Sequence, residues 1–239
     1  MEETRDIGAK LTGWTPPPRP AGAPLAGRYA RLAALSPEAH AAVLFRANAA
    51  SDAIWNFLPY GPFASLPAYH RWMREVTAGD DPLFYAIENR DTGAWGGVAS
   101  YLRICPEAGS IEIGHINFAP ALQRSRAATE AMYLMMRWAF EAGYRRFEWK
   151  CDARNLPSRR AAQRLGLSYE GIFRQATVVK GRNRDTAWFA AIDAEWPALK
   201  EAFDAWLDPS NFGPDGRQRE KLGDLTRLVR VAEDPGLHG

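Results

Sequence analysis

The sequence contains few of the residues that usually carry metal or disulfide chemistry. Among its 239 residues there are only two cysteines and four histidines. Cys105 and Cys151 show no disulfide or metal-ligand spacing, and the histidines are scattered along the chain. We therefore expect no metal site and a reducing, cytoplasmic setting.

Long apolar runs and a strong excess of one charge are also missing. Lys and Arg number 30 against 28 Asp and Glu, and this net charge of +2 is too balanced to indicate nucleic-acid binding. The N-terminus is polar and has no apolar signal-peptide core, and no segment is apolar for long enough to span a membrane. Hydrophobic residues make up 46% of the chain, which is enough for a substantial core.

Proline and glycine gather at the start of the chain. The segment "PPPRP" (16–20) and the "AGAPLAG" that follows cannot form a helix or a central strand. Residues 1–27 are therefore interpreted as an arm that wraps the protein or stays flexible, with a polyproline ligand as the alternative. We expect one domain over 28–208 and a polar C-terminal extension over 209–239.

Hydrophobic periodicity predicts a single mixed α/β domain between these extensions. Strands are expected at 28–35, 83–89, 95–104, 109–118, 145–152, 170–179 and 185–193. Helices are expected at 37–47, 67–79, 127–143, 156–166 and 196–208, with a short one near 222–229. The aromatic, proline-broken segment 51–63 between the first two helices is expected to be irregular.

The stretch "QRSRAATEA" (123–131) precedes the most apolar of these helices and has the character of an anion-binding turn. The start of a helix presents unpaired N–H groups and the positive end of its dipole. Anion-binding turns normally contain glycine, but Arg124 and Arg126 stand here instead. A second such helix begins near Pro157. The strands that precede the two helices are expected to lie side by side. We expect a ligand with a pyrophosphate to fit the first helix start.

With these motifs the sequence resembles the GNAT acyltransferase superfamily, in particular its RimJ/RimL-like branch, over residues 28–208. "QRSRAATEA" matches the family turn Q-G-x-G-x-A-T-E-A, and Asn155–Ser158, followed by "LGL", matches the N-x-x-S motif. "EIGH" (112–115) matches the strand before the turn. The resemblance implies the GNAT fold: an α/β protein with a mixed, mostly antiparallel sheet, splayed at the acetyl-CoA site, and helices on both faces.

The resemblance also implies which residues bind acetyl-CoA. The turn would hold the pyrophosphate on backbone N–H groups, Asn155 would bond the pantetheine, and Ser158 would lie near the thiolate as a proton donor. The implied cofactor-binding residues are Phe118, Gln123, Arg124, Ser125, Arg126, Ala127, Ala128, Asn155 and Ser158.

Two departures from the family pattern affect this assignment. Arg124 and Arg126 are interpreted either as solvent-facing residues with negative φ or as side chains that reach the pyrophosphate or the 3′-phosphate. Many members also place a tyrosine acid four residues before the glycine that ends the second helix. Ala162 stands at that position, so Ser158 or water must protonate the leaving thiolate.

Glu112 is the first candidate for the base that deprotonates the amine, and a strand residue paired with an arginine is the alternative. His115, whose ordinary pKa suits the task, is the second candidate, and water is the third. Cys151 alternates with Phe147 and Trp149 and is expected in the core rather than as an acyl-accepting nucleophile.

The acceptor site is expected where the family places its acceptor loops. Trp55, Phe57 and Tyr60 are interpreted as an aromatic acceptor wall or as plain packing. Asp185 is a candidate for substrate contact at the end of "KGRNRD" (180–185), a charged hairpin tip for which a nucleic-acid patch is the alternative.

These observations predict an acetyl-CoA-dependent N-acetyltransferase that transfers the acetyl group directly to a primary amine, either a protein N-terminus or a small molecule. A non-catalytic acyl-CoA-binding or regulatory module is the alternative. We expect no nucleic-acid, membrane or metal partner, and the aromatic surface leaves a homodimer open.

Overall fold

We describe the protein from a computed structural model, which covers residue 8 and residues 10–237. The expected N-terminal arm therefore lies partly outside the described residues. None of the described helices combines the length and the apolar character that crossing a bilayer requires.

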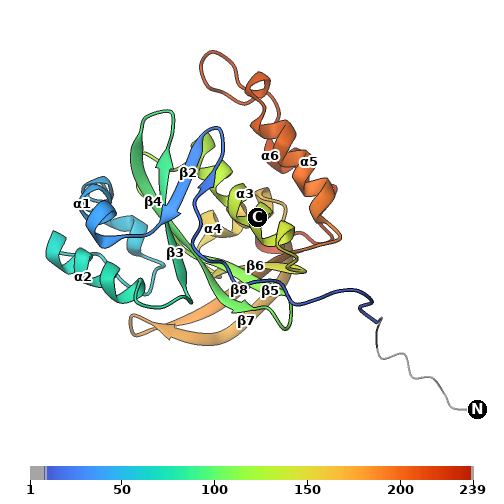
Figure 1. The fold of residues 1–239 in the computed structure, drawn as a ribbon, viewed down its shortest axis with the longest axis horizontal. Helices are drawn as coiled ribbons and strands as arrows, with labels where there is room; N and C mark the ends of the chain where they lie inside the picture. Colours follow the sequence, from blue (N-terminus) through green and yellow to red (C-terminus); the bar gives the residue numbers. More distant parts are fainter. Residues whose placement is uncertain (1–7, 9, 238–239) are drawn as a thin grey trace, which may run out of the picture.

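The chain is built around an eight-stranded sheet with the order β1-β2-β3-β4-β5-β6-β8-β7 (Figure 1). The strands are β1 Leu25–Ala26, β2 Ala30–Ala34, β3 Leu83–Asn89, β4 Ala94–Cys105, β5 Ser110–Phe118, β6 Arg146–Asp152, β7 Ser168–Val179 and β8 Arg182–Ile192. The helices are α1 Pro37–Asn48, α2 Leu66–Val76, α3 Arg126–Glu141, α4 Leu156–Arg164, α5 Trp196–Leu207 and α6 Leu222–Thr226. There are also short 3-10 helices, namely η1 Asp52–Trp55 between α1 and α2, η2 Pro209–Asn211 after α5, and η3 Pro235–Leu237 after α6. The predicted order of elements is confirmed from β2 to α5.

Neighbouring strands run antiparallel except for β5 and β6, which are parallel because α3 forms the crossover between them. Their pairing runs from Ser110↔Arg146 to Ile113↔Trp149 and then stops. Both strands continue past that point, β5 to Phe118 and β6 to Asp152. The two strands therefore part toward their carboxyl ends, and a space opens in the middle of the sheet.

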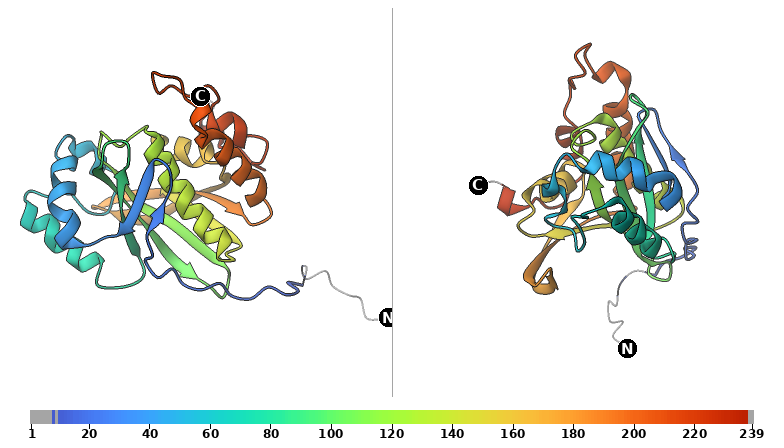
Figure 2. Two further views of the ribbon diagram at one scale, coloured as in Figure 1. Left: turned by 45° about the horizontal axis from the view of Figure 1, so that its top comes forward. Right: turned by 90° about the vertical axis from the view of Figure 1, so that its left-hand side faces the viewer.

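Helices cover both faces of the sheet (Figure 2), which confirms the predicted architecture. On one face α1 and α2 pack against side chains such as Phe84 and Val98. On the other face α3, α4 and α5 pack against a larger core that includes Ile87, Ile113 and Phe189. Because side chains alternate along a strand, β3 is buried on both of its faces.

The acidic residue of the "ATEA" motif fastens the sheet to α3. The carboxylate of Glu130 is buried and accepts the backbone N–H groups of Arg28, Tyr29 and Ala30 at 2.9, 2.5 and 2.6 Å. A Cβ atom at Gly27 would lie 2.3 Å from the Glu130 carboxyl carbon, so glycine is required there. This part of the motif holds the entry to β2 in place.

Both terminal segments lie against the domain. The Arg19 guanidinium donates to the Ile104 carbonyl at 2.9 Å, and the Tyr144 hydroxyl donates to the Pro18 carbonyl at 3.1 Å. At the other end Asp234 is fully buried and accepts two hydrogen bonds from the Arg159 guanidinium, at 2.6 and 2.5 Å. The C-terminal segment thus closes over α4 and is part of the folded unit.

Candidate active site

A cleft of about 2080 Å³ opens where β5 and β6 part. Its lining includes the starts of α3 and α4, β5, β6 and β8, several residues between Ala50 and Pro59, and part of the C-terminal segment. The residues from α3 and α4 belong to one side of the sheet, and the side chain of Glu112 stands on the side that carries α1 and α2. The cleft therefore gives access to the sheet from both faces.

At one end of the cleft, the turn before α3 leaves backbone N–H groups unpaired. The Ser125 N–H is used by the Leu122 carbonyl, and the Ala128 N–H by Ser125 Oγ, which caps the helix at 3.0 Å. Within the described structure the N–H groups of Arg124, Arg126 and Ala127 have no protein acceptor. These groups and the helix dipole form a potential anion site.

The two arginines of this turn differ from each other. Arg124 has a φ of +57° and an exposed side chain, so our interpretation that both arginines have negative φ is wrong for this residue. The Arg126 guanidinium lies 3.0 Å from Asp91, and 4.4 and 4.9 Å from the ring centroids of Tyr29 and Phe212. Arg126 is therefore held by protein groups, and Arg124 keeps the exposed guanidinium.

The start of α4 lines the same cleft. Asn155 caps this helix through a bond from the Ser158 N–H to its side-chain oxygen at 3.2 Å. Ser158 Oγ accepts a hydrogen bond from the Trp149 indole at 3.0 Å, so its own O–H remains a donor. Cys151 is buried below this point, and burial raises the pKa of its thiol to about 11, as suits a core residue.

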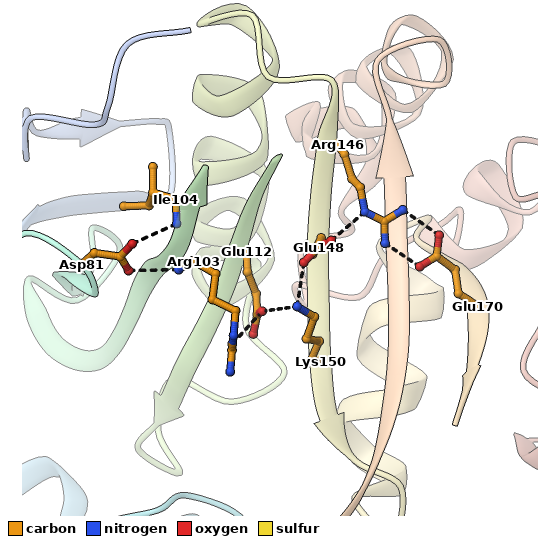
Figure 3. A network of polar contacts seen from close by, with 8 residues as sticks. All are labelled: Asp81, Arg103, Ile104, Glu112, Arg146, Glu148, Lys150 and Glu170. Atoms are coloured by element: carbon orange, nitrogen blue, oxygen red, sulfur yellow. Dashed lines mark hydrogen bonds and ion pairs between the residues drawn. The ribbon is translucent and has the colours of Figure 1, made fainter. Parts of the chain in front are cut away.

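Glu112 lies at the centre of a chain of ion pairs that crosses the sheet (Figure 3). Its Oε2 atom lies 2.8 Å from both Arg103 and Lys150, and Lys150 continues to Glu148 at 2.7 Å. The Glu112 side chain is only 4% exposed. Burial raises the pKa of this carboxyl, and the two cations offset part of that effect.

His115 lies beside this chain on a β-bulge. It has a φ of +51°, and its Nδ1 atom lies 3.2 Å from the hydroxyl of Tyr60, whose ring stacks on the imidazole. Burial, and then the charges of Arg103 and Arg184, lower its pKa to about 4. His115 is therefore neutral at physiological pH.

The structure separates the expected acceptor residues. Phe57 lines the cleft, whereas Trp55 is buried in an aromatic cluster and reaches this region through its carbonyl, which accepts from Lys180 Nζ at 2.9 Å. Tyr60 does not line the cleft itself but contacts His115, which does. Asp185 is occupied within its own hairpin, where it accepts from the Gln175 N–H at 2.8 Å, and it is absent from the cleft lining.

Of the expected cofactor residues, the structure brings most together along the cleft. These are Phe118, Gln123, Arg124, Ser125, Arg126, Ala128, Asn155 and Ser158, with Ala127 buried behind them. Gln123 also donates from its side chain to the Phe118 carbonyl at 2.8 Å, which ties the turn to the end of β5.

Sequence reasoning missed several residues of the cleft. Lys150 and Trp188 occupy alternating strand positions, but only the strand register reveals that Lys150 reaches the carboxylate of Glu112 and that Trp188 lies beside Lys150. Phe212 and Arg217 come from the C-terminal segment, whose polar composition gave no signal of a role. Among the described residues no cluster of His, Cys, Asp and Glu could hold a metal ion.

Comparison with known proteins gives consistent matches. A family model described as an acetyltransferase (GNAT) domain matches residues 31–168. The crystal structure of a GCN5-related N-acetyltransferase from Brucella melitensis is 45% identical, with a TM-score of 0.89, over 91% of this chain and 100% of that one. A probable GNAT-family acetyltransferase from Chromobacterium violaceum ATCC 12472 is 43% identical, with a TM-score of 0.76, over 80% and 96%.

The ribosomal L7/L12 alpha-N-protein acetyltransferase RimL shares the fold at 21% identity, with a TM-score of 0.60, over 71% of this chain and 94% of that one. The comparison with curated proteins gave no match.

Proposed function

The chain belongs to the GNAT acetyltransferase family, and on that premise we propose that it transfers an acetyl group from acetyl-CoA to a primary amine. One observation carries the proposal. A single cleft has unpaired N–H groups at the start of α3 and a buried carboxylate, Glu112, where β5 and β6 part. An anion site and a base are the two groups that such a reaction requires of the protein.

The residues present fit acetyl-CoA. The N–H groups of Arg124, Arg126 and Ala127 would hold the pyrophosphate, and the exposed Arg124 guanidinium is the one available to a phosphate. The parted edges of β5 and β6 would receive the pantetheine, with Asn155 beside it. The acetyl thioester supplies the activated carbonyl for direct transfer.

Glu112 is proposed as the base, directly or through a water molecule. Burial raises the pKa of its carboxyl, which brings its basicity closer to that of the amine. His115, with a pKa of about 4, is a weaker base and is proposed to shape the site with Tyr60. Ser158 is proposed to protonate the leaving thiolate, because Ala162 occupies the position of the usual tyrosine.

The acceptor is a protein N-terminus, as the name of RimL states for that protein, or a small-molecule amine. Phe57 contributes an apolar surface to either. Both cysteines are free, which fits the cytoplasmic setting that we propose for the reaction.

The test combines two measurements. CoA affinity is measured by calorimetry, and thiol release from acetyl-CoA is measured over a panel of peptides and small amines. We expect micromolar CoA binding and amine-dependent thiol release. Tight binding of CoA without turnover of any amine would contradict the proposed enzymatic function. It would favour the alternative, a non-catalytic acyl-CoA-binding module.

A further inference from the structure

Arg184 on β8 is a half-buried cation that has no counter-charge among the described residues. It lines the cleft, and its Nε–H is buried with no hydrogen-bond partner in the described structure. Its guanidinium forms no ion pair with any described carboxylate, whereas the half-buried Arg126 pairs with Asp91, and Arg146 pairs with Glu148 and Glu170. A buried guanidinium donor without an acceptor is costly unless a ligand supplies the acceptor.

A second unpaired donor lies on the same strand. The indole N–H of Trp188 is also buried and has no hydrogen-bond partner among the described residues, and Trp188 lines the same cleft. Its ring is fixed by Lys150, whose Nζ lies 3.8 Å from the ring centroid, and by Phe173 at 4.5 Å. Arg184 and Trp188 occupy alternate positions of β8, so their side chains share one face of the sheet.

The charges around this face favour an anionic group. Arg103 and Lys150 are balanced by the carboxylates of Glu112 and Glu148, and His115 is neutral. Arg184 adds a positive charge to this balanced set, close enough to His115 to lower the imidazole pKa. An acceptor that carried only its ammonium group would be repelled here, and one that also carried an anion would not.

The far side of this region is partly closed. The β7–β8 hairpin bends across to the α1–α2 connection, where Lys180 Nζ donates to the Trp55 carbonyl at 2.9 Å. Residues 50–59 and the hairpin thus face each other across the cleft. This contact limits the length of an acceptor in that direction and favours a small molecule over a protein chain.

We propose that the acceptor is a small primary amine that also carries a carboxylate, and that Arg184 binds this carboxylate. The inference rests on the proposed acetyltransferase function. An arginine presents its Nε–H and one Nη–H side by side, in the geometry of a carboxylate, and Trp188 offers its N–H to a further oxygen of the acceptor.

In the reaction the amine nitrogen bonds to the acetyl carbon, the carbon–sulfur bond breaks, and the amine proton leaves to Glu112. The thiolate is protonated to CoA, and the carboxylate is unchanged.

The test is a panel of matched acceptors assayed by thiol release from acetyl-CoA. Each common amino acid is compared with its amide and with the amine that lacks the carboxyl group. We expect at least one amino acid to be used with a kcat/KM more than about tenfold above that of both counterparts. Arg184→Met should remove this preference, and Arg182→Met, an exposed arginine of the same strand, should retain it.

Three results would overturn the proposal while the acetyltransferase function stands: equal use of the neutral counterparts, an equal loss for all acceptors in Arg184→Met, or better use of a peptide N-terminus than of any amino acid. If CoA binds and no amine is used, the proposed function fails, and the carboxylate site is tested by itself. N-acetyl amino acids are then titrated into the CoA-saturated protein. Binding that Arg184→Met abolishes supports the site, and absence of binding rejects it.

Discussion

The Nζ atom of Lys150 lies 2.8 Å from Oε2 of Glu112, on neighbouring strands at the point where these strands part. The pair lowers the pKa of this buried carboxyl and so favours the ionised form that a base requires, although burial raises the pKa by more. It also fixes the carboxylate at the edge of the cleft.

Replacing Glu112 with glutamine should remove the base and keep the shape of the site. We expect kcat/KM for the amine to fall by about 10²–10⁴-fold, with CoA affinity unchanged. Glu148→Gln is the matched control, because Glu148 also pairs with Lys150 but does not line the cleft. Equal losses in the two variants, measured by thiol release, would assign Glu112 a structural role only.

The low pKa of His115 predicts a loss of stability in mild acid. As the pH falls below 6.5, the unfolded chain protonates this histidine, whereas the folded protein resists until about pH 4. The unfolding free energy should therefore drop by roughly 2 kcal/mol from this group between pH 6.5 and about pH 5.

The control for that prediction is His115→Asn, since asparagine tolerates the φ of +51°. Urea denaturation at the two pH values should show a smaller pH dependence in the variant than in the native protein. The same pH dependence in both would contradict the assignment.

Arg124→Gly should stabilise the turn. Arginine at a φ of +57° is strained, and glycine adopts this conformation freely, so we expect the unfolding free energy to rise by about 1 kcal/mol. Arg124→Ala keeps the unfavourable φ and serves as the control. Denaturant titration distinguishes the two variants.

The same pair of variants tests the phosphate contact. If the guanidinium reaches the 3′-phosphate, both variants should weaken CoA more than dephospho-CoA, as measured by calorimetry. If the backbone N–H groups suffice, both affinities should stay within about threefold of the native values.

Asp234→Asn should detach the C-terminal segment. It leaves the Arg159 charge buried without a counter-ion, and breaking such a pair costs about 3–5 kcal/mol. Asp224→Asn, on the same segment, is expected to be nearly neutral, because Asp224 forms no ion pair with another described residue. A loss below 1 kcal/mol for Asp234→Asn in urea denaturation would show that the segment is only loosely held.

The sequence predicted elements better than it predicted partners. Ser36, the capping residue before Pro37, and the periodicity of α3 are local signals, so these two helices could be predicted closely. The contact of Glu112 with Lys150 depends on the register between two strands separated by a helix, and no local pattern encodes it. The two-residue strand β1, within the arm, could not be predicted either, because it is defined only by its pairing with β2.

The cleft itself shows a similar division. The turn and the start of α4 were recognisable as motifs, and the structure places both along one cleft. Asp185 was predicted from its loop position, but its side chain is used to order the hairpin. Arg184, one residue earlier, points to the other face of β8, and this difference follows from the strand pairing, which the "KGRNRD" composition does not reveal.

The contacts of Arg126 with the rings of Tyr29 and Phe212 limit how the molecule can be divided. Tyr29 precedes and Phe212 follows the stretch that the family model matches, residues 31–168, yet both rings lie against the guanidinium at the start of α3. A fragment cut to the matched stretch would retain the whole of "QRSRAATEA" (123–131) and lose the two rings that hold the Arg126 side chain. If recombination between relatives exchanged only residues 31–168, the recombinant would therefore receive "QRSRAATEA" without the Tyr29 and Phe212 that pack against it.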